Sequence, residues 1–309
     1  LDPRASSRSR YLRFKPLTDR AHNPETDLEM DRQLIHTFVK EASQRHDWDA
    51  ELSHTLFELL IPLGLKEFAA DGKNLLLQVT EETAGLPWEM LMDGLDGCEP
   101  ISVRGSMIRQ LSSLSEKARP LAALERSVLV VGDPPSKNFA ELPSAQDEAV
   151  KVAAALRANH FEVECMVRPN GTDVIKKLMA KPHRILHLSG HGVYEDLPSQ
   201  KPRSGMVLGD ELLLTPAIFG QIRICPELVF LNCCHLGRID SSETFFPRLA
   251  ASLATEVIRS GAKAVIAAGW AVEDQSAEIF ALQFYRSMLA GRQFGEAVLE
   301  ASRDTFAQR

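Results

Sequence analysis

Two short strings of the sequence join a reactive side chain to a glycine at the end of an apolar run. Residues 185–192 read ILHLSGHG and residues 229–237 read VFLNCCHLG. The first string supplies the imidazole of His191 and the second supplies the thiol of Cys234. A thiolate is a strong nucleophile, and a nearby imidazole can take its proton. The pair therefore indicates a cysteine hydrolase.

Buried parallel strands are the elements that must position this pair. Residues 184–189 and 228–232 are almost continuously apolar, as is typical of strands covered by helices on both faces. In open α/β sheets, functional sites form at the carboxyl ends of the strands. We therefore expect His191 and Cys234 to reach one edge of a sheet from two of its strands.

Strand geometry also separates the two adjacent cysteines. Side chains alternate between the two faces of a strand. Asn232 and Cys234 should therefore share one side, and Cys233 should point the other way, into the packing. By the same rule, His187 and His191 should lie on one side of their strand.

Acyl transfer also needs hydrogen-bond donors for the developing oxyanion. Gly192 has no Cβ, so its backbone N–H can approach a substrate closely. The backbone N–H of Cys234 is the natural second donor. These two groups are the predicted oxyanion hole.

The second half of the chain alternates strand and helix patterns. Right-handed crossovers between such elements give a mostly parallel sheet in a three-layer αβα sandwich. Ser144 with Asp147, and separately Thr172, read as helix caps, and Gly209-Asp210 reads as a hairpin turn. The expected strands are 128–131, 161–167, 184–189, 228–232 and 264–268, and the expected helices are 144–158, one from Thr172, 247–260, 274–289 and 294–306.

The preceding residues suggest two further regions. Residues 1–48 are polar and charge-rich with one amphipathic helix, and read as a linker or the tail of an upstream domain. Residues 49–120 form an N-terminal subdomain, and residues 121–309 form the catalytic core. Because the sequence starts without Met, we expect a fragment of a longer chain. Within 49–120 the patterns predict helices over 52–63 and from Pro87, and strands over 74–79 and 101–111.

Composition narrows the function classes. The 309 residues carry a formal net charge of -7, which argues against nucleic acid as a direct partner. Five irregularly spaced cysteines do not form a secreted disulfide framework, so we expect a reducing cytoplasm. No apolar run approaches the ~20 residues of a membrane span, so we expect no membrane association.

The two strings resemble those of a known peptidase group. HLSGHG at 187–192 is similar to the Ser-Gly-His-Gly string of metacaspases and other caspase-fold peptidases. NCCHLG at 232–237 is similar to their Asp-Ser-Cys-His-Ser-Gly string. Over residues 50–309 the chain resembles more closely the CHAT domain, a bacterial caspase-like peptidase domain. The strings LPWEML at 86–91, GWAVED at 269–274 and FGEAV at 294–298 support this resemblance.

The resemblance implies a caspase-like sandwich with a dyad of His191 and Cys234 that cuts a protein substrate after a chosen P1 residue. It implies an oxyanion hole from Gly192 and Cys234. We expect neither a cofactor nor a metal. CHAT domains are often attached to tetratricopeptide repeats. We therefore expect regulation by an upstream domain or partner of that kind.

One position departs from the metacaspase pattern. Asn232 stands where metacaspases place an acid that helps to bind a basic P1 side chain, so the resemblance does not carry Lys/Arg specificity. Asp274 could supply that acid, although a role as a helix N-cap is the simpler explanation. Asn232, Asp274 and Trp270 are the candidate substrate-binding residues, and Trp270 has core packing as its alternative.

Other functions fit the sequence less well. A catalytically inactive caspase-like scaffold that binds protein partners is the main alternative. A zinc site from His187, His191, Cys234 and His235 lacks a CxxC or HExxH pattern. A nucleotide-binding module lacks the GxGxxG and GxxxxGK[ST] loops. A vicinal disulfide between Cys233 and Cys234 would be strained.

Overall fold

Five parallel strands, in the spatial order β14-β13-β8-β6-β7, form the central sheet of the larger of two compact units. The strands are β6 (Ser127–Gly132), β7 (Glu162–Val167), β8 (Ile185–Ser189), β13 (Leu228–Asn232) and β14 (Ala264–Ala267). Our computed structural model describes residues 11–16, 25–44, 48–72, 74–94, 99–112, 121–123, 125–195, 203–210, 212–233, 246–268 and 274–308.

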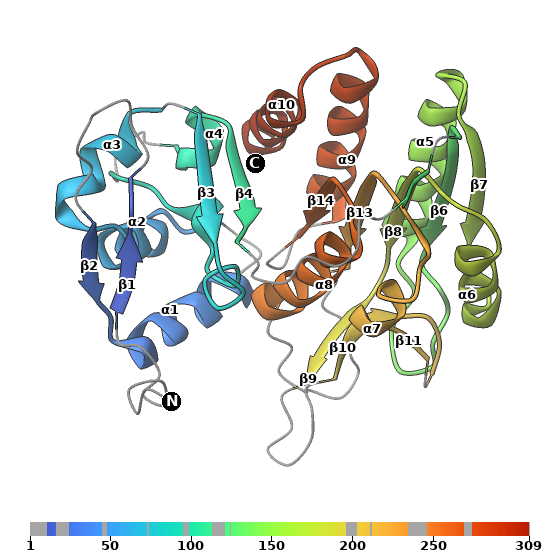
Figure 1. Cartoon of the computed structure of the whole chain (residues 1–309), viewed down its shortest axis with the longest axis horizontal. Helices are drawn as coiled ribbons and strands as arrows, with labels where there is room; N and C mark the ends of the chain where they lie inside the picture. Colours follow the sequence, from blue (N-terminus) through green and yellow to red (C-terminus); the bar gives the residue numbers. More distant parts are fainter. Residues whose placement is uncertain are drawn as a thin grey trace. The chain divides into compact units, whose positions relative to one another are not determined.

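Helices cover both faces of this sheet. One face packs against α6 (Gly171–Ala180), α7 (Pro216–Phe219) and α8 (Phe246–Ser260). The other packs against α5 (Pro143–Ala158), α9 (Asp274–Leu289) and α10 (Phe294–Ala307), with α9 and α10 side by side (Figure 1). The predicted α/β class, a three-layer αβα sandwich, is confirmed.

The alternation of strand side chains divides the core into two apolar clusters. In β6, Leu129 and Val131 join the cluster under α6 and α8, whereas Val128 and Val130 join the cluster under α5 and α9. All four are fully buried. Because both faces are covered, these strands carry continuous apolar runs, which made them recognisable from the sequence.

A small antiparallel sheet follows β8. It consists of β9 (Gly192–Glu195), β10 (Arg203–Val207) and β11 (Leu213–Leu214), with β10 in the centre. The predicted hairpin around Gly209-Asp210 joins β10 to β11 and is confirmed. The sequence did not predict β9, which starts directly after His191.

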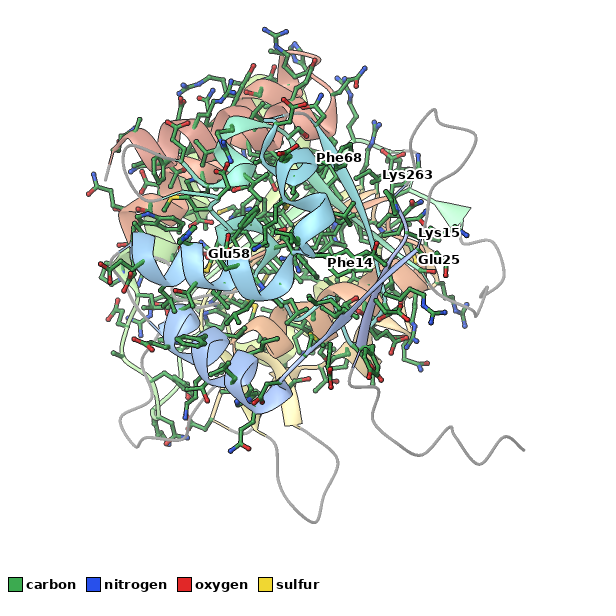
Figure 2. The ribbon with its side chains drawn as sticks, turned by 90° about the vertical axis from the view of Figure 1, so that its left-hand side faces the viewer. Phe14, Lys15, Glu25, Glu58, Phe68 and Lys263 are labelled. Carbon is green, nitrogen blue, oxygen red and sulfur yellow. The ribbon has the colours of Figure 1, made fainter. Side chains whose placement is uncertain are left out.

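The second compact unit contains residues 1–75 and 87–106. Its hairpin of β1 (Tyr11–Phe14) and β2 (Thr26–Glu29) was not predicted. Lys15 Nζ lies 3.3 Å from Glu25 Oε1 beside this hairpin (Figure 2). The helical segments of this unit are α1 (Arg32–Gln44), α2 (Ala50–Leu60), η2 (Leu63–Leu65), α3 (Lys66–Ala70), η3 (Trp88–Met90) and α4 (Ile101–Arg104).

Two further strand pairs complete the described structure. In the first, β3 (Leu75–Val79) lies beside β4 (Met107–Leu111) in a two-stranded sheet. The second pairs β5 (Leu121–Ala122) with β12 (Ile224–Cys225) in parallel. The domain boundaries at 48 and 120 stay a prediction. Within the ranges given above, no helix combines the length and apolar composition needed to cross a bilayer.

Residues 101–111 are not the single strand that the sequence predicts. The first part is the short helix α4, and only Met107–Leu111 forms a strand. Ser102 Oγ donates to the Glu89 carbonyl at 2.7 Å, and Arg104 lies 2.5 Å from Asp93 Oδ1. These contacts with residues distant in sequence stabilise the helical turn.

Three helix starts also differ from the prediction. The helix expected from Pro87 is the single 3₁₀ turn η3. Helix α5 starts at Pro143, whose fixed φ suits a first helical position, so Ser144 is not its cap. In α6 the N-cap is Asn170, whose side chain accepts a hydrogen bond from the backbone N–H of Thr172.

Candidate active site

The carboxyl ends of three neighbouring strands are level with one another. Ser189, the last residue of β8, is in register with Asn232 at the end of β13 and with Gly132 at the end of β6. The N–H of Gly190 donates to the Asn232 carbonyl at 3.0 Å, which continues the ladder beyond β8. The residues that follow β8 and β13 therefore start from adjacent positions on one edge of the sheet.

His191 is buried at this edge, and its orientation is fixed. Its Nε2 lies 2.7 Å from the carbonyl oxygen of Ala140. Because a carbonyl oxygen can only accept, Nε2 carries the hydrogen. The Phe139 ring lies against the imidazole, with 4.8 Å between the ring centroids. In the neutral ring, Nδ1 then bears the lone pair that can take a proton.

Two main-chain features connect His191 to β9 and β10. The carbonyl of His191 accepts a 2.8 Å hydrogen bond from the N–H of Val207. Gly192 is the first residue of β9, is buried, and is in register with Met206 of β10. The predicted oxyanion donor Gly192 therefore lies on a hydrogen-bonded strand.

Cys233 occupies the apolar core, as the alternation of side chains predicts. It is 3% exposed and belongs to the cluster under α6 and α8. Its Sγ lies 3.8 Å from the Leu188 carbonyl oxygen. The thiol of Cys233 is therefore directed into the sandwich rather than toward the carboxyl edge.

Three of the predicted site residues cannot be placed in the same way. Cys234 and Trp270 lie outside the described residues. Asp274 is the first residue of α9, but its side chain also lies outside the description. Their roles as nucleophile and substrate-binding residues stay predictions.

Asn232 lies in a buried polar cluster on the α5 and α9 face of the sheet. Its Nδ2 donates to Glu148 Oε2 at 2.7 Å. The other carboxylate oxygen of Glu148 lies 2.9 Å from Nε2 of His187, although the approach lacks hydrogen-bond geometry. His187 Nδ1 lies 3.3 Å from the hydroxyl of Tyr285. None of these four side chains is more than 3% exposed, so β8, β13, α5 and α9 meet at one polar cluster.

The electrostatics of the cluster define its hydrogen positions. Burial raises the pKa of Tyr285 well above its usual value, and the nearby charge of Glu148 raises it further. Tyr285 therefore stays a phenol and can donate to Nδ1 of His187.

Sequence reasoning missed Glu148 and Tyr285, although one signal was present. Glu148 follows the apolar spacing of its helix, together with Ala145, Ala149 and Val152, all of which are buried. A charged residue on the buried stripe of an amphipathic helix requires a polar partner in the core. No comparable signal marks Ala140, whose backbone rather than side chain contacts His191.

The structure describes two of the four candidate zinc ligands, His187 and His191, and neither supports a zinc site. The ring nitrogens of His187 face Glu148 and Tyr285, and Nε2 of His191 donates to Ala140. In the part of the chain that the structure describes, no group of three or more His, Cys, Asp or Glu side chains could hold a metal ion.

Comparison with known proteins adds two findings. The family profile described as CHAT domain matches residues 50–308. Among solved structures, the chain is similar to the Arg-specific cysteine proteinase gingipain R, with a TM-score of 0.47, 12% sequence identity, and coverage of 89% of this chain and 70% of that one. No curated protein matches the chain. The family match therefore extends over most of the sequence, including the two strings that contain His191 and Cys234.

Proposed function

Because the chain belongs to the CHAT domain family, we propose that it is a cysteine endopeptidase that cleaves a protein substrate with a dyad of His191 and Cys234. The observation that carries this proposal is the 2.7 Å contact between His191 Nε2 and the Ala140 carbonyl. It orients a buried imidazole at the edge where β13, the strand preceding Cys234, also ends.

In the proposed reaction, Nδ1 of His191 takes the proton of the Cys234 thiol. The thiolate attacks the scissile carbonyl carbon, and the oxyanion accepts hydrogen bonds from the N–H groups of Gly192 and Cys234. The imidazolium then protonates the leaving amine, which leaves an acyl-enzyme. Water, activated by His191, attacks the acyl carbon and releases the second product and the thiol.

The Ala140 carbonyl contributes to this cycle without reacting. While Nδ1 carries the transferred proton, the ring is positively charged in a buried position, and burial disfavours a charge. A carbonyl dipole that accepts from Nε2–H stabilises that charge. It also prevents the ring from turning its protonated nitrogen toward the thiol.

The test is a peptide-library cleavage profile of the wild type and of two cysteine variants. Cys234→Ala should lose all cleavage above background, whereas Cys233→Ala should keep the same preferred site, because Cys233 is part of the core. Unchanged cleavage by Cys234→Ala would refute the dyad. Absence of cleavage by every form, with binding of a protein partner retained, would favour the inactive scaffold.

The substrate preference and the regulation are also proposals. Asp274→Ala should change the preferred P1 class if its carboxylate binds that side chain, and should leave the profile unchanged if it only caps α9. We propose regulation by an upstream domain or partner in a reducing cytoplasm. Equal activity of this chain and a longer form without any partner would contradict the regulatory part.

A further inference from the structure

The backbone segment that orients His191 is the loop of residues 133–142 between β6 and α5. We call it the histidine-supporting loop. It leaves the sheet beside β8, where the N–H of Asp133 donates to the Ser189 carbonyl at 2.9 Å. Its residues Phe139 and Ala140 make the ring and carbonyl contacts with His191. The position of the imidazole therefore depends on what holds this loop.

Asp133 holds the two ends of the loop together. Its Oδ2 accepts hydrogen bonds from the N–H of Leu142 at 3.1 Å and from Nε2 of Gln146 at 2.9 Å. Asp133 is 2% exposed and has a φ of 48°. A residue other than glycine persists in this conformation only where the surrounding contacts enforce it. A buried carboxylate thus closes the base of the loop at the start of α5.

Asp210 holds the middle of the loop from a different element. It lies in the turn between β10 and β11, and its Oδ1 accepts from the Lys137 N–H at 2.5 Å and from Ser136 Oγ at 3.2 Å. The pKa of Asp210 is lowered, mainly because that backbone N–H donates to the ionised carboxylate. The same hairpin binds the backbone of His191 through Val207.

A third attachment lies next to Ala140. Glu141 forms a 2.7 Å ion pair with Arg168 and accepts a hydrogen bond from Gln146. The side chains of Glu141 and Arg168 are both substantially exposed. Exposed ion pairs contribute little to the free energy of unfolding. The two aspartates differ from Glu141 because they bind backbone N–H groups of the loop, on either side of Phe139 and Ala140, and they are therefore the anchors of its main chain.

We propose that Asp133 and Asp210 are positioning residues for the dyad, which act on His191 through the histidine-supporting loop. This inference rests on the proposed function. Neither carboxylate contacts the imidazole, but each fixes a segment within a few residues of Ala140. A hydrogen bond weakens steeply when its distance or angle departs from the optimum. Loosening either anchor should therefore free the imidazole to rotate and uncouple it from the thiol.

Asp210 is the better first target because it is exposed, so its variant should fold. The experiment compares Asp210→Ala with Asp173→Ala, an exposed acid on α6 whose described side-chain partner is Lys176. For the best library peptide, Asp210→Ala should lower kcat about tenfold and leave KM within about twofold. A small loss in the orientation of the His191 imidazole is enough for a tenfold change in rate. Asp173→Ala should match the wild type.

A second measurement reports on the imidazole rather than on turnover. The rate of alkylation of Cys234 by iodoacetamide, followed by mass spectrometry of its peptide, gives the pH midpoint of thiolate formation. Asp210→Ala should move this midpoint toward the value of an isolated thiol, about 8.5. His191→Gln should do the same. Nuclear magnetic resonance of ¹⁵N-labelled histidine should show that Asp210→Ala reduces the population of the Nε2–H form of His191.

The anchor at Asp133 is tested with two replacements. Asp133→Gly accommodates the positive φ but removes the carboxylate, whereas Asp133→Asn keeps one acceptor oxygen. Asp133→Gly should lose more activity than Asp133→Asn, although it relieves the backbone strain. The reverse order would show that the conformation rather than the carboxylate matters.

The outcomes separate this inference from the proposed function. If His191→Gln shifts the alkylation midpoint and Asp210→Ala does not, the dyad stands and the positioning role is wrong. If neither shifts it and cleavage does not depend on Cys234, the proposed function fails and the positioning role fails with it. A fall in thermal stability with unchanged kcat, alkylation midpoint and histidine tautomer would also overturn the inference, because it would leave Asp210 a purely structural role.

Discussion

The carboxamide of Asn232 donates a 2.7 Å hydrogen bond to the carboxylate of Glu148, and both side chains are buried. The bond joins the end of β13 to α5, two residues before Cys234. The bond engages the side chain of Asn232, which stands where metacaspases place an acid that helps to bind a basic P1 side chain. The bond therefore favours a role for Asn232 within the fold.

Asn232→Asp should destabilise the protein strongly. It would put two buried carboxylates in contact and replace a hydrogen bond with repulsion. We expect a loss of about 3–5 kcal/mol in the free energy of unfolding, the usual effect of leaving a buried charge without its partner. Urea unfolding measures it.

The matched control for this change is the double variant Asn232→Asp with Glu148→Gln. It keeps one carboxylate and one amide in contact with their positions exchanged, so it should recover most of the lost stability. A fully stable Asn232→Asp that gains cleavage after Lys or Arg would instead show that this side chain reaches the substrate.

Gly132→Ala should disturb the junction of β6 and α5. A Cβ at Gly132 would lie 2.7 Å from the Cβ of Ala149 and 2.8 Å from the carbonyl oxygen of Ala145. Since both atoms belong to a packed helix, we expect a loss of about 1–3 kcal/mol, as for other overpacked cores. Thermal and urea unfolding measure it. Gly64→Ala is the control, because nothing lies within 4 Å of its Cβ, and a change there as large as that at Gly132 would contradict the packing argument.

Cys233→Ala should cost little stability and no specificity. It removes one buried sulfur atom from the cluster under α6 and α8, comparable to the loss of one methylene group, or about 1 kcal/mol. The library profile should keep its preferred site. A variant that folds but no longer cleaves would identify Cys233, and not Cys234, as the nucleophile.

The buried His183 should make the protein less stable in acid. Burial is the main cause that lowers its pKa from the usual 6.5. Its Nε2 donates to the Lys177 carbonyl, so its Nδ1 accepts from Ser127 Oγ, each at 3.2 Å. As pH falls below 6.5, the unfolded chain binds a proton that the folded ring resists, so the free energy of unfolding decreases.

His183→Gln tests this dependence, because glutamine can make both hydrogen bonds but does not titrate. The urea midpoint of the variant should decline less than that of the wild type between about pH 7 and pH 5. Ser127→Ala keeps the titrating ring and should keep the acid decline. Parallel curves for the wild type and His183→Gln would show that other groups cause the decline.

The sequence predicted those parts of the fold whose signal is local. Strands β8 and β13 are apolar on both faces, so their runs stand out, and alternation correctly directed Cys233 into the core. The hairpin of β1 and β2 has only four residues in each strand, too few for a periodic pattern. For residues 101–104, the contacts with Glu89 and Asp93 stabilise a helix where local pattern favours a strand.

The polar surroundings of the site were hidden for a related reason. Glu148 and Asn232 are 84 residues apart. No local pattern in either segment indicates that these two side chains form a hydrogen bond. The support of His191 by Ala140 is a backbone contact, which any residue type could make. Residue identities thus predicted the strand edge, whereas the contacts that orient the imidazole depend on tertiary structure.

Residues 274–308 follow all five strands of the sheet in chain order, yet they cover the face that holds His187 and Asn232. During synthesis, α5 is therefore the first of the three helices to cover that face, and His187 lacks its tyrosine partner until α9 emerges. We therefore expect a nascent chain to complete this face of the sandwich only after residues 274–308 have emerged. Ribosome-bound chains stalled before residue 274 should be readily degraded by added protease, and resistance of those chains would contradict this order of assembly.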